Sequence, residues 1–284
     1  MSQAGAFLSH SRGRRFASSW AGTAACMLLL AWAPTAPGET IQERGTRVVK
    51  DALAALGGSR YLGMEDRVEK GRAYSFYRED LSGLAIAAIY TRYLTPKTSK
   101  GLGQRVRQAF GKNEDSWDLF LEDGEGWDVT YHGARPIEQT LLDRYRDSTL
   151  NDVFYILREK WNTPGMIYES RGADVVDNQP VEIVDITDPD NRVVTVYFHQ
   201  STKLPVRQVF YRRDPKTRDR HEETTVYSKY RDVGGGVMWP FAVYRARDGE
   251  KVFQMFADSV EINQNLPDNL FTLPGDIKRL KPPK

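Results

Sequence analysis

The chain has 284 residues, of which 40% are hydrophobic and 27% are charged, and its formal net charge is +2. This composition is typical of folded globular proteins and excludes a chain that is mainly disordered. The length allows one large domain or two ordinary ones.

The first 38 residues have the layout of a secretory signal. Arg12, Arg14 and Arg15 precede an apolar run at 20–33, and small residues and prolines follow as far as Gly38. We expect a signal peptide (1–38) that is cleaved near Gly38, with Ala36 two residues before the cut. The alternative is an uncleaved signal anchor, although the run is shorter than the ~20 residues that a membrane span needs. The pattern therefore predicts an exported protein.

Removal of this signal changes the charge balance and the cysteine content. The segment holds three of the 40 basic residues and no acidic one, which leaves 37 basic residues against 38 acidic ones. A nucleic-acid-binding protein would keep a basic surplus, so nucleic acid is not expected as a partner. Cys26, the one cysteine, is also lost. The exported domain therefore has neither a disulfide nor a cysteine nucleophile.

The exported chain begins with a helix signal. Thr40 and Glu43 stand three residues apart, which fits a capping box. Gly57 and Gly58 supply a helix end. Between these signals, apolar residues recur at helical spacing: Val48, Val49, Ala52, Leu53 and Leu56. The pattern predicts one amphipathic helix before the rest of the domain.

From about Val68 the hydrophobic period changes to two. Runs rich in β-branched and aromatic residues alternate with Asp, Asn, Gly and Pro turns. These runs cover residues 74–77, 84–94, 117–121, 127–131, 181–186, 193–198, 204–211, 224–230, 237–244 and 252–262. Strands joined by short turns pair antiparallel, so the pattern predicts an antiparallel meander and argues against a doubly wound parallel sheet.

One helical segment interrupts the predicted meander. Pro136 suits a first helical position, and residues 162–165 supply an end. Apolar residues between them form two series, Ile137, Leu141, Leu142 and Tyr145, then Leu150, Val153, Phe154, Leu157 and Trp161. The sequence shows no internal repeat and no long linker. We therefore expect a single domain at 39–276, followed by a basic tail at 277–284.

Several short strings stand in the order and spacing of a known family. They are AALGG at 54–58, DGEGW at 123–127, DNQPV at 177–181, FHQSTKLPVR at 198–207, GVMWP at 236–240 and the span from Ile262 to Pro274. Through them the chain resembles the LolA/LolB-like outer membrane lipoprotein carriers, also called outer membrane lipoprotein-sorting proteins. The resemblance implies an α+β fold, namely a curved, half-open antiparallel β-barrel with lid helices.

The same resemblance implies a function. It implies a periplasmic protein that binds the acyl chains of lipoproteins or lipids in an apolar cavity for sorting to the outer membrane. It further implies inner- and outer-membrane loading and receptor proteins as partners, and no cofactor, metal or catalytic residue. Residues 270–273 would form a terminal element that closes against the barrel.

The wall of such a cavity would consist of inward-facing apolar side chains on alternating strand positions. On these grounds the candidates for lipid binding are Ile86, Tyr90, Trp117, Leu119, Trp127, Val196, Phe198, Phe210, Trp239, Phe241 and Phe256. The lid would contribute Leu141, Leu142, Phe154 and Leu157. For each of these residues the alternative is an ordinary role in the core.

A further implication of the resemblance concerns a lid-contacting arginine. The best-known carriers use an Arg early in the barrel that contacts the lid and couples opening to cargo loading. In this chain the corresponding stretch offers Arg105 and Arg107 as candidates, after Arg92. Surface solvation is the alternative role for them.

Two other classes of function compete with a carrier. The histidines after residue 38 are His132, His199 and His221, and none has HExxH spacing or stands beside a nucleophile elbow, so no enzyme is expected. A calcium site at Asp188, Asp190 and Asn191 is an alternative. The other class is a periplasmic lipoprotein sensor or partner-binding scaffold of the same fold. A protein partner would require an exposed apolar patch on the convex face, whereas a carrier would hide its apolar surface inside.

Overall fold

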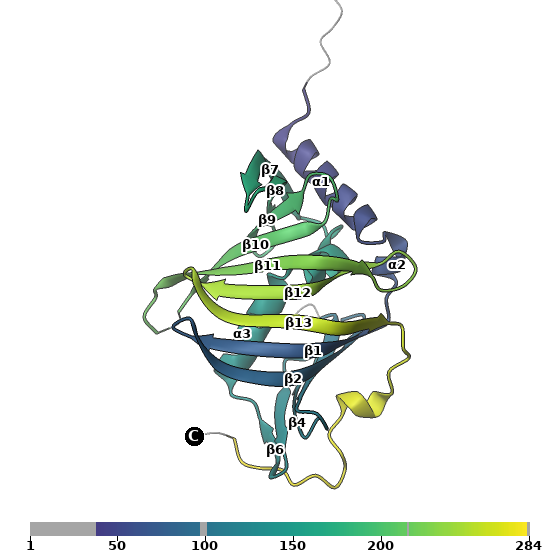
Figure 1. Ribbon diagram of the computed structural model, residues 1–284, viewed down its shortest axis with the longest axis vertical. Helices are drawn as coiled ribbons and strands as arrows, with labels where there is room; N and C mark the ends of the chain where they lie inside the picture. Colours follow the sequence, from purple (N-terminus) through teal and green to yellow (C-terminus); the bar gives the residue numbers. More distant parts are fainter. Residues whose placement is uncertain (1–37, 97–100, 215, 283–284) are drawn as a thin grey trace, which may run out of the picture. The chain divides into compact units, whose positions relative to one another are not determined.

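The computed structural model describes residues 38–96, 101–214 and 216–282 (Figure 1). The predicted signal peptide lies outside the described residues except for Gly38. From residue 39 onward the chain forms one compact unit. No helix in the described ranges combines the length and the apolar character that crossing a membrane requires.

In this unit, thirteen strands of the described chain form one sheet in the order β6-β5-β4-β3-β2-β1-β13-β12-β11-β10-β9-β8-β7. All neighbouring strands are antiparallel, and they follow chain order except that β1 pairs with β13. Irregularities such as the one at Lys70 and Gly71 bend individual strands. The structure therefore confirms the predicted curved antiparallel half-barrel with helices.

The sequence predicted ten strands and missed three of those observed. The strands are β1 (Asp66–Tyr77), β2 (Asp80–Tyr93), β3 (Gln104–Phe110), β4 (Ser116–Phe120), β5 (Gly126–Thr130), β6 (Gly133–Pro136), β7 (Ile167–Val176), β8 (Gln179–Thr187), β9 (Val193–His199), β10 (Pro205–Arg213), β11 (Arg220–Asp232), β12 (Met238–Arg247) and β13 (Glu250–Ile262). The missed strands are β3, β6 and β7. Strands β3 and β7 contain arginines and other polar residues, and β6 has only four residues. All three therefore lack the alternating apolar pattern by which the other strands were predicted.

The helices are α1 (Ile41–Ala55), α2 (Ser59–Leu62), α3 (Gln139–Leu150), α4 (Val153–Tyr155), the π-helix η1 (Ile156–Lys160) and the 3₁₀ helix η2 (Asp268–Phe271). The predicted capping box is confirmed, because the Thr40 hydroxyl accepts a hydrogen bond from the Glu43 N–H (3.1 Å) and Glu43 accepts one from the Thr40 N–H (2.9 Å). Pro136 ends β6 and does not begin a helix, since α3 begins at Gln139.

Helix α1 lies close to the edge strand β7. A Cβ atom on Gly45 would stand 2.4 Å from the carbonyl oxygen of Tyr168, so only glycine allows this approach. The helix thereby brings its apolar stripe, which includes Val48 and Leu53, onto the sheet.

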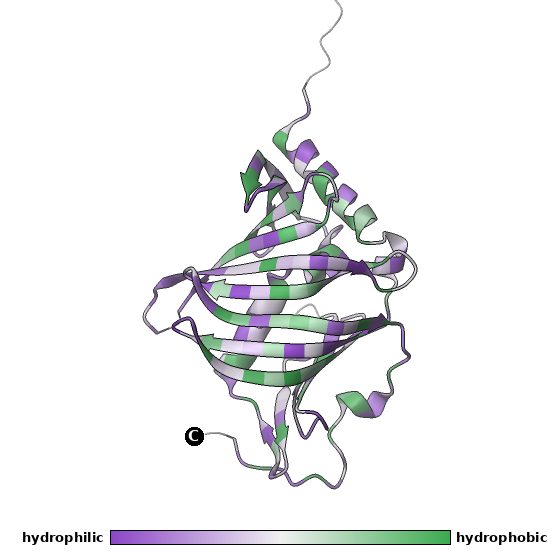
Figure 2. Ribbon diagram, in the orientation of Figure 1, coloured by the Kyte–Doolittle hydropathy of each residue, from purple (hydrophilic) through white to green (hydrophobic). Residues whose placement is uncertain are grey.

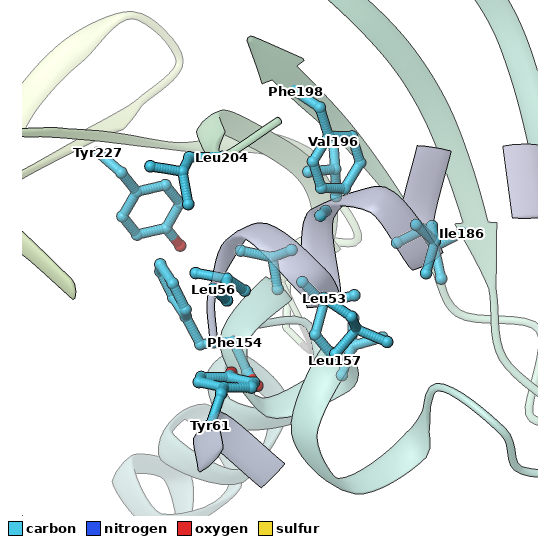
Figure 3. Packing of buried hydrophobic residues seen from close by; sticks show 14 of the residues in the cluster. Leu53, Leu56, Tyr61, Phe154, Leu157, Ile186, Val196, Phe198, Leu204 and Tyr227 are labelled. Carbon is cyan, nitrogen blue, oxygen red and sulfur yellow. The ribbon is translucent and has the colours of Figure 1, made fainter. Parts of the chain in front are cut away.

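The main hydrophobic core lies where α1, α2, α4 and η1 meet strands β8 to β12 (Figure 3). Leu56 from the end of α1 and Leu157 from η1 have no exposed surface, and Tyr61 from α2 is 1% exposed. The Tyr61 hydroxyl donates a hydrogen bond to the carbonyl oxygen of Phe154 (2.7 Å), so its polar end is satisfied in the core. We call the sheet face that packs against these helices the inner face.

A second cluster lies on the opposite, outer face of β1 to β6, where the C-terminal segment 263–280 covers it. Leu266 and the fully buried Phe271 pack there against Val68, Tyr90 and Leu119. Two backbone N–H groups at the start of the segment donate to the buried Asp66 carboxylate, at 2.7 and 3.0 Å. At its end the segment runs beside β6 as a parallel bridge from Arg279 to Ala134. The terminal apolar element therefore closes against the outer side of the barrel.

Candidate functional site

A cavity of about 430 Å³ lies between the inner face of the sheet and the helices α3 and α4. Its volume falls in the range of sites for small ligands, roughly 300–1,000 Å³. The sheet contributes Ala73, Ala87, Ile89, Val106, Phe110, Trp239, Val243, Phe253 and Met255, among others. The strand wall of the cavity is therefore largely apolar.

Strand alternation explains which positions reach the cavity. On β2 the lining residues are the odd-numbered ones from Ala87 to Tyr93, and on β3 they are the even-numbered ones from Gln104 to Phe110. These residues are cross-strand partners, such as Ala87 with Phe110, so they share one face of the sheet. Even-numbered residues of β2 consequently face away from the cavity.

We call α3, α4 and η1 the lid. The lid side of the cavity is more polar than the strand wall. Tyr145, Ser148 and Thr149 line it from α3, and Asp152 lines it where α4 begins. The Asp152 carboxylate accepts hydrogen bonds from the N–H groups of Phe154 (2.8 Å) and Tyr155 (3.3 Å), which caps α4. Burial raises the pKa of Asp152. The cavity thus pairs an apolar sheet with a hydrogen-bonding lid.

Arg67 on β1 is the central charged residue of the cavity wall. Its Nε donates to the Glu69 carboxylate at 2.7 Å, its guanidinium also donates to the Tyr93 hydroxyl, and the same group lies 3.9 Å from the centre of the Trp239 ring. Burial by itself lowers the pKa of Arg67, but the nearby Tyr93 and Glu69 outweigh burial and raise it. Arg67 is therefore held charged by partners on three strands.

Tyr93 connects this cluster to the lid. Arg158 on η1 stacks on the Tyr93 ring at 4.0 Å and donates hydrogen bonds to carbonyl oxygens at the end of α2, among them that of Tyr61 at 2.7 Å. The lid, α2 and the strands β1 and β2 are joined through these two arginines and one tyrosine.

A second set of contacts fixes the lid to β10. The buried Gln208 accepts a hydrogen bond from the Val153 N–H (2.8 Å) and donates one to the Asn151 carbonyl (3.1 Å). Nearby, Arg212 donates to Asp147 and Ser148, both at 2.8 Å. The junction of α3 and α4 is therefore anchored to the sheet beside the cavity.

Two predicted site residues line the cavity, namely Trp239 and Phe154. Five others lie in the main core and not in the cavity wall: Val196, Phe198, Phe210, Phe241 and Leu157. They support the strands and helices that form the cavity without lining it.

Six predicted cavity residues lie on the outer face, which corrects the prediction. They are Ile86, Tyr90, Trp117, Leu119, Trp127 and Phe256. Ile86 is 53% exposed, and Tyr90 packs in the outer cluster beneath the C-terminal segment. Alternation separates the two faces of a strand but does not say which face is inner, because here both faces carry apolar residues.

The predicted lid leucines and arginines also require correction. Leu141 is 49% exposed, and Leu142 lies against Gly126, so neither lines the cavity. Arg105 forms a two-pronged ion pair with Glu122, at 2.5 and 2.6 Å. Arg107 lies 4.2 Å from the Trp117 ring, on the outer face. Neither arginine reaches the lid from the cavity.

The sequence analysis missed Arg67, which lines the cavity together with Arg245. A usable signal was present, because Arg67 and Glu69 are an opposite-charge pair two residues apart and therefore share one strand face. Charged residues on the face of a strand that should be buried are rare unless they are paired.

The predicted calcium alternative does not match the local geometry. The Asp188 carboxylate is 5% exposed and is bound by Arg192 (2.7 Å) and Lys160 (3.2 Å). It also accepts the backbone N–H groups of Asp190 and Arg192. Through these contacts Asp188 stabilises the turn between β8 and β9. Among the described residues, no three His, Cys, Asp or Glu side chains gather as a metal site would require.

Asp118 on β4 supplies a pH-dependent feature next to the cavity. It is the cross-strand partner of the lining residue Gln108 and of Asp128. Burial, and secondarily the Asp128 charge, raise the pKa of Asp118 from 3.8 to about 6. Because the folded form holds the proton more tightly than the unfolded form, the stability from this group is present at low pH. It is lost as pH rises from about 4 to about 6.

We expect Asp118→Asn to stabilise the protein at pH 7.5 by about 1–2 kcal/mol, because it removes a partly buried negative charge that lies opposite the charge of Asp128. This expected gain is smaller than the free energy that the full pKa shift would correspond to, because solvent screens the partly exposed side chain. The gain should shrink at pH 4.5. Denaturant unfolding at the two pH values measures it, with the exposed Asp115→Asn as control; an equal gain at both pH values would contradict the assignment.

Comparison with known proteins adds evidence on the fold. No protein-family model matches the chain, and no curated protein sequence matches it. A solved structure described as an outer membrane lipoprotein-sorting protein domain, from Vibrio parahaemolyticus, is 11% identical, with 81% of this chain and 97% of that chain covered and a TM-score of 0.54. A DUF1329 family protein from Desulfovibrio piger is 12% identical, with 82% and 98% covered and a TM-score of 0.57.

These two structures share the architecture over nearly their whole length, at identities that establish the fold alone. The curved antiparallel sheet and the lid helices are the features that the sequence resemblance implied. The chain therefore has the LolA-like fold of outer membrane lipoprotein-sorting domains.

Proposed function

We propose that this protein is a non-catalytic carrier that binds acyl chains of lipoproteins or lipids in the cavity beneath α3 and α4. The observation that carries the proposal is a cavity of about 430 Å³ whose strand wall is largely apolar, in a chain with the LolA-like fold. The name of the Vibrio structure, a lipoprotein-sorting domain, supports this class of cargo.

The energetics of the cavity fit a carrier. Each CH₂ group that leaves water contributes roughly 0.8 kcal/mol, so an acyl chain binds tightly without any covalent step. The side chains of Phe110 on β3 and of Phe253 and Met255 on β13 offer such a surface from the inner face of the sheet. Cargo would then be released to an acceptor that buries the same chain better.

The lid would open through the contacts that join it to the cavity wall. In this proposal the coupling residue is Arg67, through Tyr93 and Arg158, in place of Arg105 or Arg107. A chain that enters between Trp239 and Phe154 would disturb the stacking of Arg67 on Trp239. The lid would thereby respond to loading.

The histidines favour a non-catalytic role. His199 accepts N–H groups of its own turn through Nδ1, at 3.2 and 3.3 Å. His221 lies 2.6 Å from Asp248 between exposed strand ends, and His132 stacks on Tyr131. None of the three lines the cavity. No step of the proposed function needs a cofactor.

The cellular setting is also part of the proposal. A signal peptide at 1–38 would direct the domain at 39–276, with its basic tail at 277–284, to the periplasm. Inner- and outer-membrane proteins would load and unload it there. The alternative, a sensor of the same fold, would use the cavity or outer face to bind a protein partner without transport.

Native mass spectrometry tests the proposal directly. The protein would be purified gently from a periplasmic extract, and bound molecules would be extracted with organic solvent and identified. We expect a co-purifying acylated species that a fluorescent fatty acid displaces. A protein that emerges empty and excludes the fatty acid would contradict a lipid-binding cavity and favour the sensor.

A further inference from the structure

The outer face of the sheet has a part that no other element covers. We call it the outer patch, and it consists of Tyr74, Phe76, Leu84, Ile86 and Phe256 on β1, β2 and β13. Leu84 is 60% exposed and Ile86 is 53% exposed. Figure 2 shows apolar segments on all three strands, which lie in front of α3 in this view.

Strand pairing makes this patch continuous. Tyr74 is the cross-strand partner of Leu84, and Arg72 is the partner of both Ile86 and Phe256. The rings of Tyr74 and Phe256 meet edge to face, with centroids 6.1 Å apart. Neighbours of this kind form one surface across three strands.

Further along the same strands, the C-terminal segment covers the outer face. At Val68, Ala88 and Tyr90 it is covered by Leu266 and Phe271 of the C-terminal segment. The C-terminal segment crosses the outer face there and then continues to β6, where Arg279 bridges to Ala134. Large apolar side chains beyond it remain in contact with solvent, which marks an interaction surface.

Cations are placed among the aromatic rings of the outer patch. Lys251 Nζ lies 4.1 Å from the centre of the Phe76 ring, and Lys229 Nζ lies 5.0 Å from that of Phe256. Arg72 is 58% exposed at its side chain and stands 3.6 Å from Asp258. Three cations therefore lie at the patch, and one of them, Arg72, is paired with a carboxylate.

We propose that the outer patch docks the protein onto an anionic lipid surface. Exposed aromatic and aliphatic side chains enter the headgroup region, and lysines or arginines beside them meet lipid phosphates. A lipid surface can bind a sheet face that has no groove. The positive charges of the outer patch are complementary to the negative charge of that surface. Because β1, β2 and β13 also form the cavity wall, docking would place that wall at the membrane.

Vesicle sedimentation tests this proposal with protein produced from the full-length sequence. Vesicles of neutral phosphatidylcholine are compared with vesicles that also contain phosphatidylglycerol. With Arg72 paired to Asp258, a net charge of about two near an anionic surface should strengthen binding by about 30-fold over neutral vesicles at low salt, and the difference should fall as salt is raised.

Two variants locate the contact. Leu84→Asp with Ile86→Asp should reduce binding to anionic vesicles at least tenfold, and Lys229→Glu with Lys251→Glu should do the same. Val175→Asp, an equally exposed apolar position on β7, is the matched control and should bind as the parent does. Thermal unfolding of each variant shows that it is folded, as expected for exposed sites.

The outcomes are decisive in both directions. Salt-sensitive binding that both double variants lose supports the proposal. Equal binding to neutral and anionic vesicles, binding that survives the variants, or no vesicle binding at all overturns it; the last result would leave an acidic protein as the occupant of the patch. A variant with a filled cavity, such as Ala87→Trp, should still bind vesicles, which separates docking from cargo binding.

Discussion

Replacing Ala87 by tryptophan is expected to abolish acyl-ligand binding while the fold is kept. Ala87 is 3% exposed and lines the cavity on β2, opposite Phe110 on β3. An indole at this position would occupy the space of at least four methylene groups. At roughly 0.8 kcal/mol for each CH₂ group, the affinity should fall by about 100-fold or more. Titration with a fluorescent fatty acid measures the loss.

The neighbouring residue supplies a matched control for this change. Ile86→Trp introduces the same side chain one position away, on the exposed outer face. We expect this variant to bind the fatty acid with unchanged affinity, because successive side chains on a strand point to opposite faces. If Ile86→Trp abolished binding and Ala87→Trp did not, the ligand site would lie on the outer face and the proposed carrier cavity would be wrong.

Phe271→Ala is expected to give the largest loss of stability among the substitutions considered. Phe271 is 1% exposed and fills the outer cluster between the C-terminal segment and β1 to β6, with the Arg92 guanidinium 5.0 Å from its ring centre. Truncation of a buried Phe costs about 3–5 kcal/mol, since apolar contact is lost and a cavity remains. Urea unfolding, analysed as a midpoint shift at constant slope, measures the change.

The adjacent exposed residue controls for local effects of this substitution. Thr272→Ala should change the free energy of unfolding by no more than about 0.5 kcal/mol, as is usual for surface positions. A loss below about 1 kcal/mol for Phe271→Ala would mean that the C-terminal segment is peripheral to the fold. In that case the segment could detach without exposing the outer cluster.

Much of the architecture could be predicted because local signals agreed with the final fold. Thr40 and Glu43 marked the start of α1, and strand alternation with turn residues marked the antiparallel meander. The apolar residues near the C-terminus predicted a terminal element, and Phe271 is indeed buried. These features depend on residues close in sequence, which is why they are readable.

The cavity was harder to predict because it depends on which strand face turns inward. Tyr90 and Trp117 have the character of cavity residues, yet the C-terminal segment gives them a second core on the outer face. Only the path of residues 263–280 across that face decides the question, and no local pattern reports it. The inner face instead carries Arg67 and Glu69. Because these residues are charged, the sequence pattern did not identify this face of β1 as the buried one.

The pairing of β1 with β13 has a consequence for the order in which the protein folds. Arg67 pairs with Ile262, so the barrel wall joins the first of the described strands to the last. A chain that crosses a membrane from its N-terminus presents β1 with an open edge until β13 arrives. Such distant pairing slows folding and leaves strand edges exposed to other chains in the meantime. In the proposed export, the edge of β1 that pairs with β13 would therefore stay unpaired until the last strand is delivered.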